Sequence, residues 1–244
     1  MADEMFGHPR LAAVYDILEA HRTDLNAHLA FAERFDAKRV LDIGCGTGVL
    51  ALLLADRGIE AVGVDPAQAS LDAATAKPGS ERVQWICGDA TALPPLQVDL
   101  VTMTGNAAQQ IAAPQTWHQT LAGAREALRP GGFLVFETRD PTVRAWEEWN
   151  PAASHKFTPL PNADTVETWG DVVDMSPPLV TFRWNYVFAT DGEHITSDST
   201  LRFRERQEVE ADLAAHGYRL HEVRDAPDRP GKEFVFIAQR PRTP

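Results

Sequence analysis

Three aspartates and a run of glycines are the residues of this chain best suited to bind a charged, nucleoside-like molecule. Asp42 opens the pattern Asp-x-Gly-x-Gly-x-Gly, whose glycines are Gly44, Gly46 and Gly48. Glycine has no side chain to keep a ligand away from the backbone, and the start of the next helix offers unpaired N–H groups to polar or anionic atoms. The turn is either a ligand-binding loop or a tight corner between a strand and a helix.

Two more aspartates follow the ends of the next two expected strands. Asp65 stands roughly 20 residues past the first glycine, where an acid can accept hydrogen bonds from ribose hydroxyls, although it could instead cap a helix. Asp89 is followed by the backbone N–H of Ala90, and an acceptor beside a donor is complementary to the edge of adenine. Because ligands bind where parallel strands end, we expect the three acids to converge on one site.

The elements that must position these residues alternate between strand and helix, which predicts a parallel sheet with right-handed crossovers. Strands are expected at 39–43, 60–64, 82–87, 98–103, 133–138, 218–224 and 233–239. Helices are expected within 9–34 and at 47–57, 67–76, 115–128 and 206–216. Residues 129–132 (Arg-Pro-Gly-Gly) are expected to form a turn before the fifth strand.

The pattern changes after residue 140. Residues 141–163 are rich in Pro, Trp and Asn, whereas residues 164–204 alternate in the manner of strands, with an aromatic residue at every second position of 182–188. The dipeptide Asp191-Gly192 is typical of a hairpin turn. We therefore expect a small antiparallel sheet inserted into the α/β domain.

Taken together, these motifs resemble those of the class I S-adenosylmethionine-dependent methyltransferases. The glycine turn resembles the family's first motif, Gly-Asp-Ala-Thr-Ala-Leu-Pro its adenine-binding stretch, and Leu128-Arg129-Pro130-Gly131-Gly132 the segment that closes its core. The resemblance covers residues 35–138 and, more weakly, the last two strands. It implies an α/β fold with a seven-stranded, mostly parallel sheet of order 3-2-1-4-5-7-6, the last strand antiparallel and helices on both faces. The small antiparallel sheet would lie between the fifth strand and the last helix.

The same resemblance implies how the chain is divided. Residues 1–140 and 205–244 would form the Rossmann-like, S-adenosylmethionine-binding domain, with residues 1–36 as an N-terminal helical lid. Residues 141–204 would form an inserted subdomain on the substrate side.

The resemblance also implies which residues hold the cofactor. Asp42 would help to hold the amino group of the methionine part, Asp65 the ribose, and Asp89 with Ala90 the adenine. Pro66 would cover the adenine, because Ser70 stands where the family frequently has methionine. The full set expected at the cofactor is Tyr15, Asp42, Gly44, Cys45, Gly46, Gly48, Asp65, Pro66, Asp89, Ala90, Gly105 and Asn106.

Two of these residues have an alternative role. Tyr15 could close over the cofactor or pack in the core. Asn106 could orient a polar acceptor or cap the next turn.

The catalytic residue is not identified, and the candidates are Glu137, Arg139 and His155. A sulfonium already activates the methyl group, so in-line displacement needs an aligned nucleophile, and a hydroxyl nucleophile also benefits from a base. By strand alternation Glu137 faces either the core or the cofactor cleft, and a surface or structural role is the alternative for all three. No metal-ligand spacing occurs, so no metal is expected. Four tryptophans could wall an acceptor pocket or form the core of the insertion: Trp146, Trp149, Trp169 and Trp184.

Composition argues against several classes of protein. The 244 residues are 44% hydrophobic and carry a net charge of −12, which argues against a nucleic-acid surface. There is no secretory signal and no apolar run of about 20 residues, so we expect a cytoplasmic protein without a membrane partner. Cys45 and Cys87 lie in segments expected to be buried, where thiols are unreactive.

The sequence favours an enzyme that methylates N or O of a small molecule, releases S-adenosylhomocysteine and acts as a monomer or homodimer. A nicotinamide-dependent oxidoreductase is the less favoured alternative, because Val49 occupies the third glycine position of the dinucleotide fingerprint. A non-catalytic S-adenosylmethionine-binding protein is the other alternative, since no catalytic tetrapeptide such as Asn-Pro-Pro-Tyr follows residues 98–103. That absence also argues against methylation of DNA bases or protein glutamine.

Overall fold

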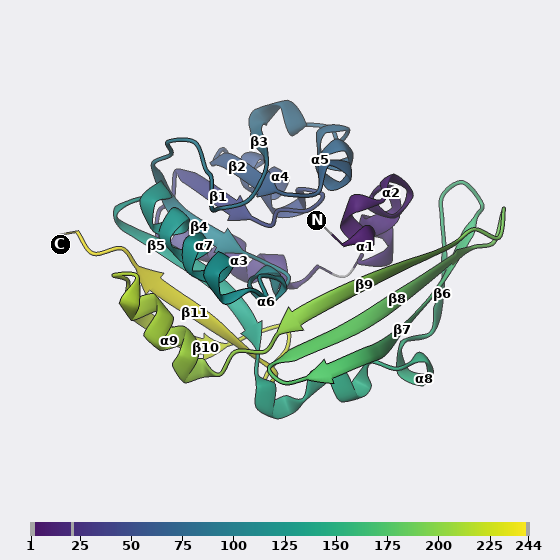
Figure 1. Ribbon diagram of the computed structural model, residues 1–244. Coiled ribbons are helices and arrows are strands. Elements are labelled where there is room, and N and C mark those ends of the chain that lie inside the picture. Colours follow the sequence, from purple (N-terminus) through teal and green to yellow (C-terminus); the bar gives the residue numbers. More distant parts are fainter. Residues whose placement is uncertain (1–2, 21, 243–244) are drawn as a thin grey trace.

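The computed structural model describes residues 3–20 and 22–242 (Figure 1). Within them, the main sheet has the strand order β10-β11-β5-β4-β1-β2-β3. Its strands are β1 (Arg39–Ile43), β2 (Glu60–Asp65), β3 (Val83–Cys87), β4 (Val98–Met103), β5 (Leu128–Arg139), β10 (Arg219–Asp225) and β11 (Glu233–Gln239). The first five run parallel, and β11 is antiparallel to both β5 and β10. The expected order is confirmed.

Helices cover both faces of this sheet. They are α1 (Glu4–Gly7), α2 (Pro9–Leu18), α3 (Asp24–Arg34), α4 (Val49–Ala55), α5 (Gln68–Thr75), α6 (Ala107–Gln110), α7 (Pro114–Ala127) and α9 (Arg206–Ala215). Val40 and Leu41 are neighbours in β1 but belong to different buried layers, as strand alternation requires. One layer packs against α3 and α4, the other against α7 and α9.

The insertion forms a second, antiparallel sheet of order β6-β7-β8-β9. Its strands are β6 (Lys156–Pro159), β7 (Thr165–Ser176), β8 (Leu179–Phe188) and β9 (His194–Arg202), preceded by the short helices Pro141–Val143, Ala145–Glu148 and α8 (Pro151–Ser154). The expected hairpin joins β8 to β9, with Gly192 at φ +70°. In Figure 1 this sheet extends away from the main one, and α1 and α2 lie between it and α5.

Two of the four tryptophans form part of the insertion's own core. Trp146 packs edge-on against Phe203, with ring centroids 4.6 Å apart, and Trp149 packs against Phe182 at 4.9 Å. Trp169 lies beside His194 on the second sheet. These aromatic contacts help to hold the irregular segment after β5 against β8.

Residues 129–132 do not form the expected turn but lie within β5. Val98 of β4 pairs with Leu128, and Leu100 pairs with Phe133, so β5 bulges between these two positions. Gly131 permits the bulge because it adopts φ +90°. The register after the bulge places the C-terminal end of β5 beside the C-terminal end of β4 and the N-terminal end of β11.

The expectation that Cys87 is buried was wrong, whereas Cys45 is buried. Cys87 ends β3, which is the edge strand of the main sheet, so one side of it has no neighbouring strand. Within the described residues, every helix falls short of the length and apolar character needed to span a membrane.

Candidate functional site

A cavity of about 570 Å³ lies where β1, β2 and β4 end, a size typical of small-molecule sites. Ten of the expected cofactor residues line it: Tyr15, Asp42, Gly44, Cys45, Gly46, Asp65, Pro66, Asp89, Ala90 and Gly105. Gly48 and Asn106 are absent from its described lining. The topology therefore brings these ten residues together from five separate segments of the chain.

The glycines of the turn differ in what surrounds them. A Cβ at Gly46 would meet nothing within 4 Å, so this glycine leaves open space beside the backbone. A Cβ at Gly48 would lie 2.3 Å from Cη2 of Trp85, so Gly48 is required by packing. The turn is tied to β2 because the N–H groups of Gly44 and Cys45 donate to the carbonyl of Val64, at 2.9 and 3.2 Å. The space at Gly46 is the part of the turn open to a ligand.

Asp65 holds this turn in place. One carboxylate oxygen accepts a hydrogen bond from the N–H of Gly46 and the other from that of Ala67, both at 2.8 Å. Burial raises the pKa of Asp65, although the two N–H groups oppose the rise. Each oxygen retains a further acceptor site, so a backbone-holding role and a ribose contact are compatible.

Asp42 is fully buried between β1 and β4. Its Oδ1 accepts a hydrogen bond of 2.9 Å from the hydroxyl of Thr102. Burial raises the pKa of Asp42 to about 6, while Thr102, His28 and Arg22 favour the charged form. A cation bound in the cavity would offset the remaining cost of burying the charged Asp42 carboxylate.

Asp89 differs from the other two acids because it is exposed at the rim. Its Oδ1 accepts hydrogen bonds from the backbone N–H and the hydroxyl of Thr91. The next residue, Ala90, is buried against α7, where Gly123 makes room: a Cβ on Gly123 would lie 1.8 Å from the carbonyl oxygen of Ala90. The close approach of α7 at Gly123 holds the backbone of Ala90 in place. No sequence motif had pointed to Gly123.

Sequence reasoning missed the residues that the N-terminal segment and the inserted sheet contribute to the cavity. Arg22 lines it from the loop between α2 and α3 and is the only cationic side chain in its described lining. The Arg22 guanidinium is paired with Asp24 at 2.8 Å. Asp198 and Thr200 line the cavity from β9. Neither region carries a recognisable motif, so only the fold could place them there.

The N-terminal segment is held against β9 by two buried serines. The N–H of Met5 donates to the hydroxyl of Ser197 at 2.8 Å, and the hydroxyl of Ser199 donates to Asp3. Asp3 and Phe6 consequently reach the cavity wall. Burial raises the pKa of Asp3 above its ordinary value.

None of the three catalytic candidates lines the cavity in the described part of the chain. Glu137 lies beneath the loop after β4, where strand alternation points it toward α3. Arg139 is half-buried, and its backbone N–H donates to Oε1 of Gln109 at 3.2 Å. His155 lies between α8 and β6, with Nε2 2.7 Å from Oε1 of Glu167. The structure thus gives these three residues other partners.

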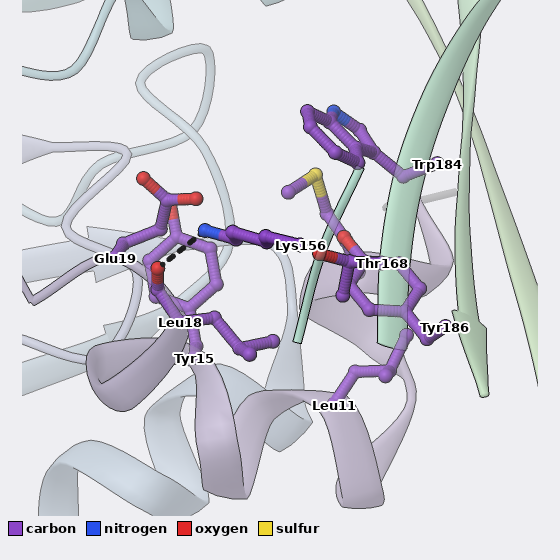
Figure 2. A pocket seen from close by; sticks show the side chains of 9 residues that line it. Leu11, Tyr15, Leu18, Glu19, Lys156, Thr168, Trp184 and Tyr186 are labelled. Carbon is purple, nitrogen blue, oxygen red and sulfur yellow. Dashed lines mark hydrogen bonds between the residues drawn. The ribbon is translucent and has the colours of Figure 1, made fainter. Parts of the chain in front are cut away.

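A second, much smaller pocket lies between α2 and the inserted sheet (Figure 2). It holds about 20 Å³, room for about one water molecule. Lys156 crosses its mouth and donates to the carbonyl of Leu18 at 3.0 Å. The buried hydroxyl of Thr168 has no partner in the described residues, and Tyr15 lines both this pocket and the cavity. Burial raises the pKa of Tyr15 to about 12, so it stays a neutral phenol between the two spaces.

Residues 40–132 match the family described as "Methyltransferase domain". The ubiquinone biosynthesis O-methyltransferase of Idiomarina loihiensis is 32% identical over 123 residues, which cover 48% of this chain and 49% of that protein. The biotin biosynthesis bifunctional protein of Cellvibrio japonicus is 34% identical over 148 residues, 57% of this chain and 28% of that protein. The matching part spans about half or less of the length of these relatives.

Solved structures resemble the chain over nearly its whole length. The CcbJ methyltransferase of Streptomyces caelestis superimposes with a TM-score of 0.76 and 22% identity, covering 98% of this chain and 100% of that one. An amino pentose methyltransferase of Micromonospora echinaspora gives a TM-score of 0.71 and 22% identity, covering 93% and 96%. These likenesses show that the main sheet and the inserted sheet occur together in known folds.

The matched segment includes the glycine turn, Asp65 and Asp89, the same residues that the fold gathers around the cavity. Motifs, strand order and similarity therefore agree: residues 40–132 match a methyltransferase domain, and the chain has the Rossmann-like fold of the S-adenosylmethionine-dependent methyltransferases.

Proposed function

We propose that this protein transfers a methyl group from S-adenosylmethionine to a nitrogen or oxygen of a small molecule and releases S-adenosylhomocysteine. The observation that carries the proposal is a single cavity, at the point where the strand order reverses between β1 and β4, that joins the glycine turn to Asp42 and Asp65. This is the place where doubly wound sheets bind nucleotides.

The cavity residues fit the parts of this cofactor. Asp42 would hold the ammonium group of the methionine part, and Arg22 its carboxylate. Asp65 would accept hydrogen bonds from the ribose hydroxyls, and Asp89 and Ala90 would meet the adenine edge. S-adenosylmethionine would supply a sulfonium-activated methyl group, and an acidic cavity favours that positive charge.

On the acceptor side, we propose that the inserted sheet and the N-terminal segment form the binding surface. Asp3 and Asp198 bring carboxylates to this part of the wall, and Thr200 brings a hydroxyl. Both carboxylate oxygens of Asp198 accept hydrogen bonds from Arg183, at 2.6 and 2.7 Å, so Asp3 is the carboxylate proposed to meet a basic nitrogen. The Asp3 carboxylate would attract this nitrogen and could take up its proton, which frees the lone pair for attack. Within this proposal, an amine is a better acceptor for the site than a hydroxyl, in keeping with the amino pentose substrate of the Micromonospora echinaspora enzyme.

The first experiment measures cofactor binding by isothermal titration calorimetry with S-adenosylhomocysteine, and with NADH as a control ligand. We expect micromolar-range binding of S-adenosylhomocysteine and none of NADH. Asp42→Asn should weaken binding, whereas Asp99→Asn should not, because Asp99 lies at the opposite end of β4 and accepts from the N–H groups of Lys38 and Arg39.

Absence of S-adenosylhomocysteine binding would refute the proposal. Binding without transfer of a radiolabelled methyl group to any of a set of amines and alcohols would favour the non-catalytic alternative.

A further inference from the structure

A buried pair of a histidine and a glutamate lies directly beneath the loop that follows β4. Nε2 of His28, on α3, is 3.1 Å from Oε2 of Glu137, near the end of β5. The side chains are 1% and 5% exposed, so the pair is shielded from water. The remaining ring nitrogen of His28 has no partner in the described residues, which makes Glu137 its polar contact there.

The second oxygen of Glu137 points at the loop. Oε1 accepts the N–H of Gly105 at 2.7 Å and, more weakly, that of Asn106 at 3.4 Å. Burial opposes ionisation of Glu137, but the hydrogen bond from His28 and the loop N–H groups together lower its pKa below the ordinary value. Glu137 is therefore ionised, and its hydrogen bonds go to His28 and to the backbone N–H groups of Gly105 and Asn106.

The loop is held from two sides. Gly105 and Asn106 both have positive φ, +62° and +61°, the left-handed region that glycine and asparagine adopt more readily than other residues. A second buried carboxylate, Glu233 on β11, accepts a hydrogen bond from Nδ2 of Asn106 at 2.9 Å. Glu137 and Glu233 therefore hold the backbone and the side chain of this turn separately.

This loop forms part of the cavity wall. Thr104 and Gly105 line the cavity, and the position of a Cβ on Gly105 lies 3.7 Å from Nη2 of Arg22, the cation of that wall. A shift of the Gly105 backbone would therefore change the space beside the proposed methionine end of the cofactor.

We propose that Glu137 is a positioning residue: together with His28, it fixes the backbone of Gly105 in the conformation that cofactor binding requires. Glu137 does not touch the cavity and acts only through the loop. The inference rests on the proposed function, and it links α3 of the lid region to the cofactor site through one carboxylate.

The test compares Glu137→Ala, Glu137→Gln and the control Asp99→Ala. Asp99 also accepts two backbone N–H groups, at 2.6 and 2.9 Å, but at the far end of β4. Glutamine keeps an oxygen for Gly105, and its amide nitrogen can donate to Nε2 of a neutral His28. Alanine leaves both groups without a partner.

Two quantities are measured: the dissociation constant of S-adenosylhomocysteine by calorimetry, and amide hydrogen exchange of residues 104–110. We expect Glu137→Ala to weaken binding about tenfold or more and to speed exchange in this segment. Glu137→Gln should stay within about threefold of wild type. Asp99→Ala should lower the melting temperature yet bind within about threefold. If Glu137→Ala does not fold, Glu137→Leu, which fills the same space, replaces it.

Wild-type affinity in a folded Glu137→Ala or Glu137→Leu protein would overturn the inference. So would an equal loss in Glu137→Gln, because charge rather than backbone positioning would then matter. Failure of the wild-type protein to bind S-adenosylhomocysteine would instead count against the proposed function itself.

Discussion

Cofactor binding should depend on pH through Asp42. Burial raises its pKa to about 6 in the empty cavity, and an ammonium group would bind only the ionised form. The ionised fraction falls from about 0.9 at pH 7 to about 0.1 at pH 5. The dissociation constant of S-adenosylhomocysteine should therefore rise about tenfold over this interval, with proton release on binding at the lower pH.

The same raised pKa has a consequence for stability. A carboxyl whose pKa is higher in the folded than in the unfolded protein contributes stability below its ordinary value of 3.8, and this contribution is lost as pH rises through about 6. The difference between the pKa of 3.8 in the unfolded protein and about 6 in the folded protein costs about 3 kcal/mol of folding free energy at pH 7. Asp42→Asn removes this cost, so it should stabilise the empty protein at pH 7 by up to about 3 kcal/mol while weakening cofactor binding.

The assay is calorimetric titration with S-adenosylhomocysteine at pH 5, 6 and 7 in buffers of different ionisation enthalpy, combined with urea unfolding at pH 4 and pH 7. In Asp42→Asn, the dissociation constant of S-adenosylhomocysteine should change less with pH. The variant should be more stable than wild type at pH 7 but not at pH 4. Equal affinity of the wild-type protein at pH 5 and pH 7, or destabilisation by Asp42→Asn at pH 7, would refute the reasoning.

Further predictions concern substitutions at four single residues. Gly48→Ala should destabilise the fold by about 3 kcal/mol or more in urea unfolding, because φ is +77° and the Cβ would meet Trp85 at 2.3 Å. Gly46→Ala should cost only about 1 kcal/mol yet weaken S-adenosylhomocysteine binding, and an equal stability loss in both variants would contradict this distinction. Asp65→Ala removes the acceptor of two backbone N–H groups, so it should lower both the melting temperature and the affinity; unchanged affinity would exclude its cofactor role. Thr168→Val should leave unfolding free energy unchanged or raise it by up to about 1 kcal/mol, because the buried hydroxyl has no partner in the described residues; a loss above about 1 kcal/mol would show that the hydroxyl is bound.

The main-sheet strands were predictable because buried parallel strands are short apolar runs bounded by turn residues. The ranges 39–43 and 98–103 agree with β1 and β4 at both ends. The bulge at residues 129–132 was not predictable, because Arg-Pro-Gly-Gly reads as a turn and becomes part of a strand only through pairing with residue 240 and β4.

The candidate site was predictable in part for the same reason. Asp42 and Asp65 end neighbouring strands, so their convergence follows from the topology. Arg22 reaches the cavity from the loop between α2 and α3, and Asp198 and Thr200 reach it from the inserted sheet. The packing of these two parts depends on long-range contacts such as Met5 with Ser197, which the sequence does not reveal.

By itself, the sequence predicted the methyltransferase fold and most of the residues that line the cavity, because glycines and acids at strand ends form a local pattern that can be recognised without knowledge of packing. Only the tertiary structure decided the direction in which Glu137 points, which the sequence left open between the core and the cofactor cleft. Its partners His28 and Gly105 lie 109 and 32 residues away along the chain. The contacts of a strand residue depend on the helix that packs on its face of the sheet. The residue spacing within β5 does not reveal which helix that is.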